Sequence, residues 1–151
     1  MTHATATKND WGQHARDSLS GAGHRSGGAR EAVVELLARQ SCCLSAQEIS
    51  DELRGAGAGV GQASVYRALD LLHEMGLVQR VEIGDGGARY EPMLPGGEHH
   101  HHAVCETCGR VTAFEDEKLE RALERLSGRL RHSMRAHDIV IRGDCSRCTR
   151  A

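Results

Sequence analysis

Residues 45–76 read SAQEISDELRGAGAGVGQASVYRALDLLHEMG. The stretch opens with a capping box, because the Ser45 hydroxyl can accept from the amide of Glu48 while the Glu48 carboxylate reaches back. The helix that begins there ends at Gly55, and a glycine-rich connection leads to a second helix. This second helix carries one apolar stripe, formed by Val65, Ala68, Leu69, Leu72 and Met75. The stretch therefore predicts two helices joined by a turn.

The residues on both sides extend this pattern. Residues 29–39 have apolar residues at helical spacing and predict a preceding helix. Residues 78–83 and 88–91 predict two strands joined across a glycine-rich tip. Three helices followed by such a hairpin predict a winged helix over residues 29–91.

Two segments outside the winged helix lack a regular apolar pattern. Residues 1–28 are rich in small and polar residues, with Trp11 and Leu19 as the only large apolar ones, and predict a flexible N-terminal tail. Residues 92–98 contain two prolines and two glycines, which predicts a hinge and a domain boundary.

Residues 99–151 predict a second, smaller domain. Strand-like pieces are expected at residues 99–105, 111–114 and 139–141. A helix expected over residues 116–131 has one apolar face, formed by Leu119, Ala122, Leu123, Leu126 and Leu130. Exposed sheet edges in so small a unit favour dimerisation. The expected fold class is α+β, with an N-terminal winged helix and a small C-terminal α/β dimerisation domain.

Composition restricts the class of protein. Of the 151 residues, 39% are hydrophobic but only 3% are aromatic, which favours small modules over a large enzyme with a deep pocket. Residues 1–90 contain nine basic and eleven acidic residues, so any binding of nucleic acid requires a local basic patch. The chain has no apolar run near the roughly 20 residues that span a bilayer, and no signal peptide. We expect a cytoplasmic protein that does not bind membranes.

Two Cys-x-x-Cys pairs lie in the second domain, Cys105 with Cys108 and Cys145 with Cys148. Cysteines in a reducing compartment are metal ligands or redox thiols more often than disulfides. Zinc prefers a closed tetrahedron of thiolates, and a two-residue spacer lets both sulfurs of a pair converge at about 2.3 Å from one ion. The alternative is a pair of separate redox dithiols. The spacing predicts one structural Zn²⁺ bound by all four cysteines.

Four consecutive histidines begin the second domain. In an extended run, His99 and His101 point to one side of the strand. His100 and His102 point to the other side. Each pair can begin a separate metal site, because imidazole is a common metal ligand. A solvated polar strand is the alternative, but four adjacent imidazoles have no packing rationale.

Together these features resemble the ferric uptake regulator (Fur) family of metal-dependent repressors. The match runs from about His24 to Cys148, and the order and spacing of the motifs are highly specific. The motifs are ASVYRAL at 63–69, RYE at 89–91, HHHH at 99–102, CETCG at 105–109 and GDCSRC at 143–148. The resemblance implies a homodimeric, metal-responsive repressor that binds a palindromic double-stranded DNA operator.

The resemblance also implies a regulatory metal site between the domains. Its four positions hold Cys43, Glu91, His100 and His102. The family often has histidine where Cys43 stands, and a thiolate there shifts the preference from iron(II) toward zinc. Zinc sensors of the actinobacteria, however, carry an aspartate and a cysteine at positions that fall on Gln79 and Met93, so Zn²⁺ and Fe²⁺ both stay open. Cys42 could replace Cys43 as the ligand, or both could be small buried apolar residues.

A second site found in many members of the family maps onto four residues. They are His99, His101, Glu120 and His137. Helical periodicity supports Glu120, which lies at the flank of the apolar face and can reach back to the sheet. Glu117 and Glu124 point farther outward and are expected to be solvated.

For DNA, the helix that begins near residue 62 resembles the family's recognition helix, which lies in the major groove. Tyr66 would pack on thymine methyl groups, and Arg67 would donate to a guanine edge or a phosphate. The candidate phosphate contacts are Gln62, Ser64, Arg25 and Arg30.

Three alternatives to a metal-responsive repressor follow from the same residues. A metal buffer or delivery protein would need the ligands but not the winged helix. A peroxide-sensing regulator of the same family tends to have aspartate where Glu91 stands, and Cys43 also argues against it. A metalloenzyme is disfavoured, because the chain has no His-Glu-x-x-His motif and four protein ligands can fill each proposed site.

Overall fold

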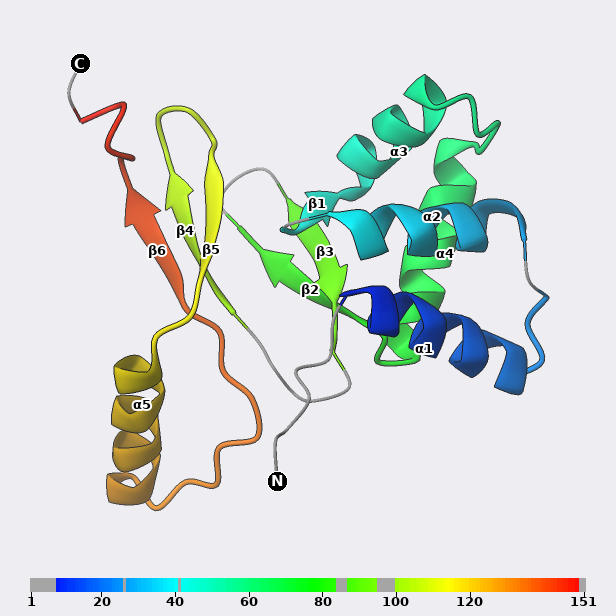
Figure 1. Cartoon of the computed structure of the whole chain (residues 1–151). Helices are drawn as coiled ribbons and strands as arrows, with labels where there is room; N and C mark the ends of the chain where they lie inside the picture. Colours follow the sequence, from blue (N-terminus) through cyan, green and yellow to red (C-terminus); the bar gives the residue numbers. More distant parts are fainter. Residues whose placement is uncertain (1–7, 26, 41, 84–86, 95–99, 150–151) are drawn as a thin grey trace. The chain divides into compact units, whose positions relative to one another are not determined.

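The computed structural model (Figure 1) describes residues 8–25, 27–40, 42–83, 87–94 and 100–149. The chain divides into a first unit, Met1–Glu98, and a second unit, His99–Ala151. Most of the hinge predicted at residues 92–98 lies outside the described residues, and so does His99. Within the described part of the chain, no helix is long and apolar enough to cross a membrane.

Three helices of the first unit follow the predicted pattern. They are α2 (Gly28–Arg39), α3 (Ala46–Gly55) and α4 (Gln62–Glu74). The capping box at α3 is present, because the Glu48 amide donates to the Ser45 hydroxyl at 3.1 Å and the Ser45 amide donates to the Glu48 carboxylate at 2.7 Å. Gly76 ends the α4 segment with a φ of 68°, a conformation that favours glycine. The apolar stripe of α4 is confirmed by its buried residues, Val65, Ala68, Leu69 and Leu72.

A three-stranded antiparallel sheet completes the winged helix. Its strands are β1 (Leu44–Ser45), β2 (Val78–Glu82) and β3 (Ala88–Pro92), in the order β1-β3-β2. The predicted hairpin is confirmed as β2 and β3, whose register pairs Gln79 with Glu91. β1 is an additional strand, and it pairs Leu44 with Tyr90. In this register the residue before β1, Cys43, falls opposite Glu91.

A further helix, α1 (Lys8–Gly21), lies where the sequence predicts a flexible tail. Trp11, Ala15 and Leu19 recur every four residues along one face of α1, and all three are buried. The Trp11 indole donates to the Leu77 carbonyl at 2.7 Å, which ties α1 to the turn before β2. The prediction of a flexible tail is therefore wrong over α1. Its sequence signal is weak, because the apolar face has only two large residues and is completed by an alanine.

The second unit is a three-stranded sheet with one helix. Its elements are β4 (His101–Cys105), β5 (Val111–Phe114), α5 (Glu117–Arg129) and β6 (Val140–Gly143). β4 lies in the centre of the sheet, antiparallel to β5 and parallel to β6. Its register with β6 pairs Cys105 with Gly143. These elements confirm the strands and the helix that the sequence predicts.

The second unit has little apolar core. All of α5 is described, and it contains no buried residue. Leu126 on α5 is 41% exposed, Leu130 after it is 67% exposed, and Ile141 on β6 is 54% exposed. Among the described residues 100–149, Cys105 is the one buried hydrophobic side chain. The stability of this unit must therefore come largely from another source.

We expect Trp11→Ala to lower the free energy of unfolding by about 3–5 kcal/mol, because it leaves a cavity beneath α1. Urea denaturation followed by circular dichroism measures this change. Gln13→Ala is the matched control, because Gln13 is exposed on the same helix, and it should change the free energy by less than about 0.5 kcal/mol. Equal effects of the two variants would show that α1 does not pack on the core.

Candidate functional site

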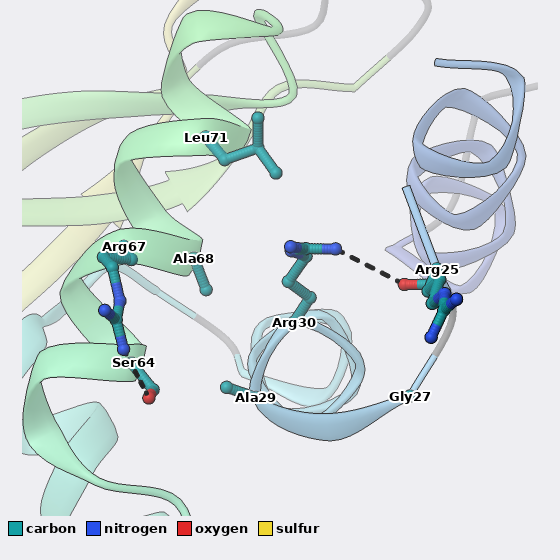
Figure 2. Close-up of a pocket in the computed structure, with 8 residues that line it drawn as sticks. All are labelled: Arg25, Gly27, Ala29, Arg30, Ser64, Arg67, Ala68 and Leu71. Carbon is teal, nitrogen blue, oxygen red and sulfur yellow. Dashed lines mark hydrogen bonds between the residues drawn. The ribbon is translucent and has the colours of Figure 1, made fainter. Parts of the chain in front are cut away.

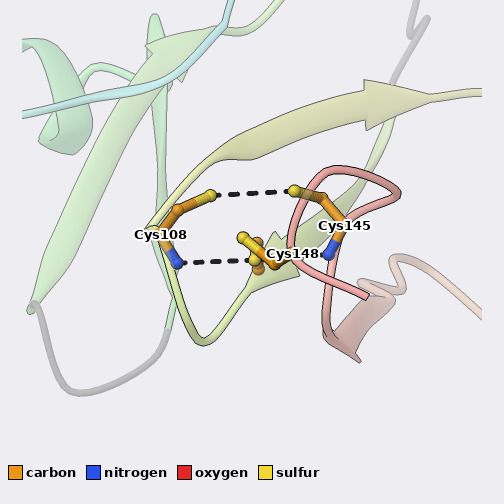
Figure 3. Close-up of side chains that lie close together, drawn as sticks. Cys108, Cys145 and Cys148 are labelled. Carbon is orange, nitrogen blue, oxygen red and sulfur yellow. Dashed lines mark hydrogen bonds between the residues drawn. The ribbon is translucent and has the colours of Figure 1, made fainter. Parts of the chain in front are cut away.

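Four cysteine sulfurs converge at one end of the sheet in the second unit. They lie within 4.8 Å of one another and belong to Cys105, Cys108, Cys145 and Cys148. Figure 3 shows side chains from two separate turns facing one another. The strand register explains this convergence, because Cys105 ends β4 beside Gly143, two residues before Cys145. Gly109 closes the turn after Cys105 with a φ of 72°, which favours glycine.

Backbone amides around these sulfurs favour thiolates. The amides of Cys145 and Cys108 donate to the Cys105 sulfur at 3.3 and 3.4 Å and lower its pKa to about 6. The amides of Cys148 and Arg147 likewise lower the pKa of Cys145. A hydrogen bond with Cys145 raises the pKa of the Cys148 thiol to about 12. Four sulfurs in this arrangement fit a thiophilic cation with tetrahedral coordination.

A second cluster in the same unit consists of His101, Glu120 and His137. One carboxylate oxygen of Glu120 lies 2.7 Å from Nε2 of His101, and the other lies 2.8 Å from Nε2 of His137. Glu120 thus reaches from α5 to the sheet, as its place at the flank of the apolar face predicts. The structure brings together three of the four residues expected at the second metal site. The fourth, His99, lies outside the described residues.

The histidines of the run point in two different directions. The centroid of the His101 ring lies 5.6 Å from the centroid of the Phe114 ring, and the His101 ring is next to Glu120. The rings of His100 and His102 instead contact each other edge to face, with their centroids 5.1 Å apart. His100 and His102 therefore form a donor pair of their own, as alternation along an extended run predicts.

Cys43 and Glu91, the other two residues expected at the regulatory site, belong to the first unit. Both are buried, with 3% and 1% of their surface exposed. A hydrogen bond with Cys42, and then burial, raise the pKa of Cys43 far above its ordinary value, and the Glu91 charge adds to the increase. A cation would reverse this effect, because it attracts thiolate and carboxylate alike. The two side chains fit a cation as a pair of anionic donors.

An ion pair that the sequence does not predict ties Cys43 to the helices. Arg89 donates to both carboxylate oxygens of Glu48, at 2.9 and 3.3 Å, and to the Cys43 carbonyl at 3.4 Å. Glu48 caps α3, and its neighbour Gln47 accepts from Gln62, at the start of α4, at 2.8 Å. Hydrogen bonds therefore link the Cys43 carbonyl to the N-terminal end of α3, and a separate hydrogen bond links that end of α3 to the start of α4. The signal in the sequence is weak, because Arg89 and Glu48 are 41 residues apart.

The polar face of α4 is open to solvent. Tyr66 is 44% exposed. Arg67 is exposed beside it and donates to the Ser64 hydroxyl at 3.2 Å. Gln62, predicted to contact phosphate, is exposed at the start of the same helix. An exposed helix with an aromatic ring and a guanidinium group can contact base edges in the major groove of DNA.

A basic cavity lies beside this face. It has a volume of about 370 Å³, and its polar lining comes from Arg25, Arg30, Ser64 and Arg67 (Figure 2). The Arg30 guanidinium donates to the Arg25 carbonyl at 3.5 Å, so this side chain reaches from α2 back to the segment that precedes the helix. Guanidinium groups only donate hydrogen bonds, so three of them and a hydroxyl suit an anion such as a phosphate. The four residues form a local basic patch in a unit that has more acidic than basic residues.

Known proteins resemble this chain along most of its length. The sequence pattern of the ferric uptake regulator family matches residues 21–142. The ferric uptake regulation protein of Bacillus subtilis is 36% identical over 121 residues, which are 79% of this chain and 81% of that protein. The ferric uptake regulation protein of Legionella pneumophila is 39% identical over 105 residues, which are 70% of this chain and 76% of that protein.

The fold leads to the same family. The solved structure of the Helicobacter pylori ferric uptake regulator has a TM-score of 0.82 against this chain, at 27% identity, and the match covers 99% of both chains. This similarity confirms the α+β fold with an N-terminal winged-helix DNA-binding domain and a C-terminal α/β dimerisation domain. The chain therefore belongs to the ferric uptake regulator family, whose members are metal-responsive transcriptional regulators of metal homeostasis and not enzymes.

Proposed function

We propose that the chain is a homodimeric repressor that binds its operator when a regulatory metal ion is held by two residues from each unit. These residues are Cys43, Glu91, His100 and His102. The observation that supports this most strongly is the position of Cys43 and Glu91 within the winged-helix unit itself. Hydrogen bonds through Arg89 connect the Cys43 carbonyl to Glu48 at the start of α3, and Gln62 at the start of α4 donates to the neighbouring Gln47. A protein that only stored or delivered metal would not need that connection.

We propose zinc as the regulatory ion. Cys43 provides a soft thiolate beside two imidazoles and one carboxylate, and this set suits zinc better than iron(II). The cation supplies the positive charge that makes the ionised thiol and carboxylate stable together in a buried place. Donors from both units would then restrain the winged helix relative to the dimerisation domain and favour the form that fits DNA.

Two further metal sites complete the proposal. The structure of the Helicobacter pylori regulator has three functional metal-binding sites, and we propose three in this chain as well. The four-cysteine cluster would hold a structural zinc ion that ties the end of β4 to the end of β6. The second site would consist of His99, His101, Glu120 and His137. Its three described members already lie within reach of one ion.

We propose that α5 forms the centre of the dimer. Its exposed apolar face, together with Ile141, requires a cover, and a second copy of the chain would provide it. A dimer with two winged helices suits a palindromic operator. In each copy α4 would enter the major groove, and the basic cavity would hold a phosphate of the DNA backbone. As a regulator of transcription, the protein would act in the cytoplasm.

We expect Cys43→Ala to remove the metal-induced gain in operator affinity and to leave a folded dimer, because it deletes the thiolate of the regulatory site. Fluorescence anisotropy of operator DNA against free zinc and iron(II) measures the response, and gel filtration reports the dimer. Tyr66→Ala is the complementary control, which should lose operator affinity and keep its metal affinity. If neither metal increases the operator affinity of the unmodified protein, the proposed function is wrong.

We expect Cys105→Ser to lose both the tightly held zinc and the dimer, since the second unit has little apolar core to replace the metal. Elemental analysis after mild chelation gives the zinc content, and analytical ultracentrifugation gives the mass. Thr107→Ala changes the same turn without removing a sulfur, so it should keep both properties. A zinc-free Cys105→Ser protein that still dimerises would argue against a structural role for the ion.

We expect Arg30→Ala to weaken operator and unrelated DNA about equally, because a phosphate contact carries no sequence information. The negative slope of log K against log salt concentration should become shallower by about 1. Titrations at several salt concentrations measure that slope. Arg54→Ala is the control, because Arg54 lies on α3 outside the basic cavity and pairs with Asp51. A loss of affinity confined to the operator would show that Arg30 contacts a base instead.

A further inference from the structure

Two cysteines lie next to each other just before β1. Their sulfur atoms are 3.6 Å apart, although the proposed regulatory site uses only one of the two side chains. Cys43 is buried, whereas Cys42 is only partly buried. Small oxidants in solution can therefore reach Cys42 more easily than Cys43. The proximity of the two thiols is a feature that metal binding by Cys43 alone does not explain.

We propose that Cys42 and Cys43 are a modification site, at which a hydroperoxide converts the two thiols into a reversible disulfide. The inference rests on the proposed function for its consequence, because Cys43 is the regulatory thiolate there. Its chemistry is independent of that function. The disulfide would make metal sensing depend on the oxidation state of the cell.

The two sulfurs need only a short movement to close this bond. A sulfur–sulfur bond is about 2.05 Å long, so the two sulfurs must approach each other by roughly 1.6 Å. The Arg89 guanidinium holds the Cys43 carbonyl, and the chain after it pairs with β3. Rotation of the Cys42 side chain would therefore supply most of the movement.

The same geometry makes the bond easy to reduce. Neighbouring Cα atoms are about 3.8 Å apart across a trans peptide, which is less than the roughly 4.4–6.8 Å that separates Cα atoms in relaxed disulfides. Strained disulfides have higher reduction potentials and are the labile, regulatory ones. A disulfide between Cys42 and Cys43 should therefore open readily when reducing conditions return.

The reaction balances with one molecule of hydrogen peroxide. The Cys42 thiolate attacks one peroxide oxygen, the O–O bond breaks, and the hydroxide that leaves takes up the proton lost by the Cys42 thiol, which gives one water and a sulfenic acid on Cys42. The Cys43 sulfur then attacks the Cys42 sulfur, and the sulfenic oxygen leaves as water with the proton of the Cys43 thiol. Two thiols are oxidised by two electrons in total, and the peroxide is reduced to two molecules of water.

The disulfide would remove the anionic sulfur from the regulatory site. Only the thiolate form of cysteine is a good metal ligand. Loss of one outer-shell partner already weakens metal binding by about 10–100-fold, and we expect loss of a direct ligand to weaken it at least as much. Oxidation would therefore release the regulatory ion and, with it, the operator.

A peptide-level experiment tests the disulfide directly. Trypsin cleaves after Arg39 and after Arg54, so it releases residues 40–54 as one peptide. This peptide contains only Cys42 and Cys43 of the six cysteines. After brief treatment of the full-length protein with hydrogen peroxide, the peptide should lose two hydrogen atoms and resist alkylation at both positions. Dithiothreitol should restore both thiols. Saturation with zinc before treatment should slow the change.

Cys42→Ser is the control for the consequence. Each protein is compared with its own zinc-dependent operator affinity before oxidation, so the comparison does not depend on how strongly the variant responds to zinc. After peroxide the variant should keep its operator affinity, whereas the unmodified protein should lose at least about 10-fold and recover with dithiothreitol. The disulfide is wrong if both thiols stay open to alkylation, if either joins a cysteine of another peptide, or if oxidation stops at a sulfinic acid. These mass readouts need neither DNA nor metal, so they separate failure of the disulfide from failure of the proposed function.

Discussion

Convergence of four cysteine sulfurs replaces an apolar core in the second unit. Among its described residues Cys105 is the one buried hydrophobic side chain, and the apolar face of α5 is exposed in the single chain. Structural zinc binds small zinc-finger peptides with about 10–16 kcal/mol, whereas the net stability of an ordinary domain is about 5–15 kcal/mol. A zinc ion held by the thiolates at the ends of β4 and β6 would therefore stabilise the sheet that positions the histidines. We propose that a second copy of the chain covers the exposed apolar face of α5.

The first unit is stabilised differently and has a different role. A continuous apolar core holds α1 to α4 together, with Trp11 and Leu69 among its fully buried residues. Cys43 lies just before β1, in the register position opposite Glu91 on β3. Arg89 links the Cys43 carbonyl to the helix cap at Glu48 on α3, which packs in the same core as α4, the helix that we propose contacts DNA. We propose that a change at Cys43 reaches α4 through α3, because Gln47 on α3 accepts from Gln62 at the start of α4.

Local signals predict most of this structure from the sequence. The capping box at Ser45, the stripe of α4 and the two-residue spacing within each cysteine pair depend on residues within a few turns of the chain, and all three patterns reappear in the structure as expected. The convergence of the two cysteine pairs depends instead on the register of β4 with β6. The tail prediction fails at α1, because Trp11 is stabilised by a carbonyl 66 residues away. The pairing of Arg89 with Glu48 and the clustering of arginines beside α4 likewise arise from tertiary contacts, which leave no local pattern.

The claim that the protein senses metal through Cys43 is tested most directly by identifying the ligands of the ion that induces operator binding. X-ray absorption spectra at the zinc edge are recorded on protein that already holds one zinc, before and after the regulatory ion is added. The difference between the two spectra gives the coordination shell of the added ion. We predict one sulfur at about 2.3 Å and three nitrogen or oxygen atoms at about 2.0–2.2 Å. A shell of nitrogen and oxygen atoms alone, in protein that binds its operator, would contradict sensing through Cys43.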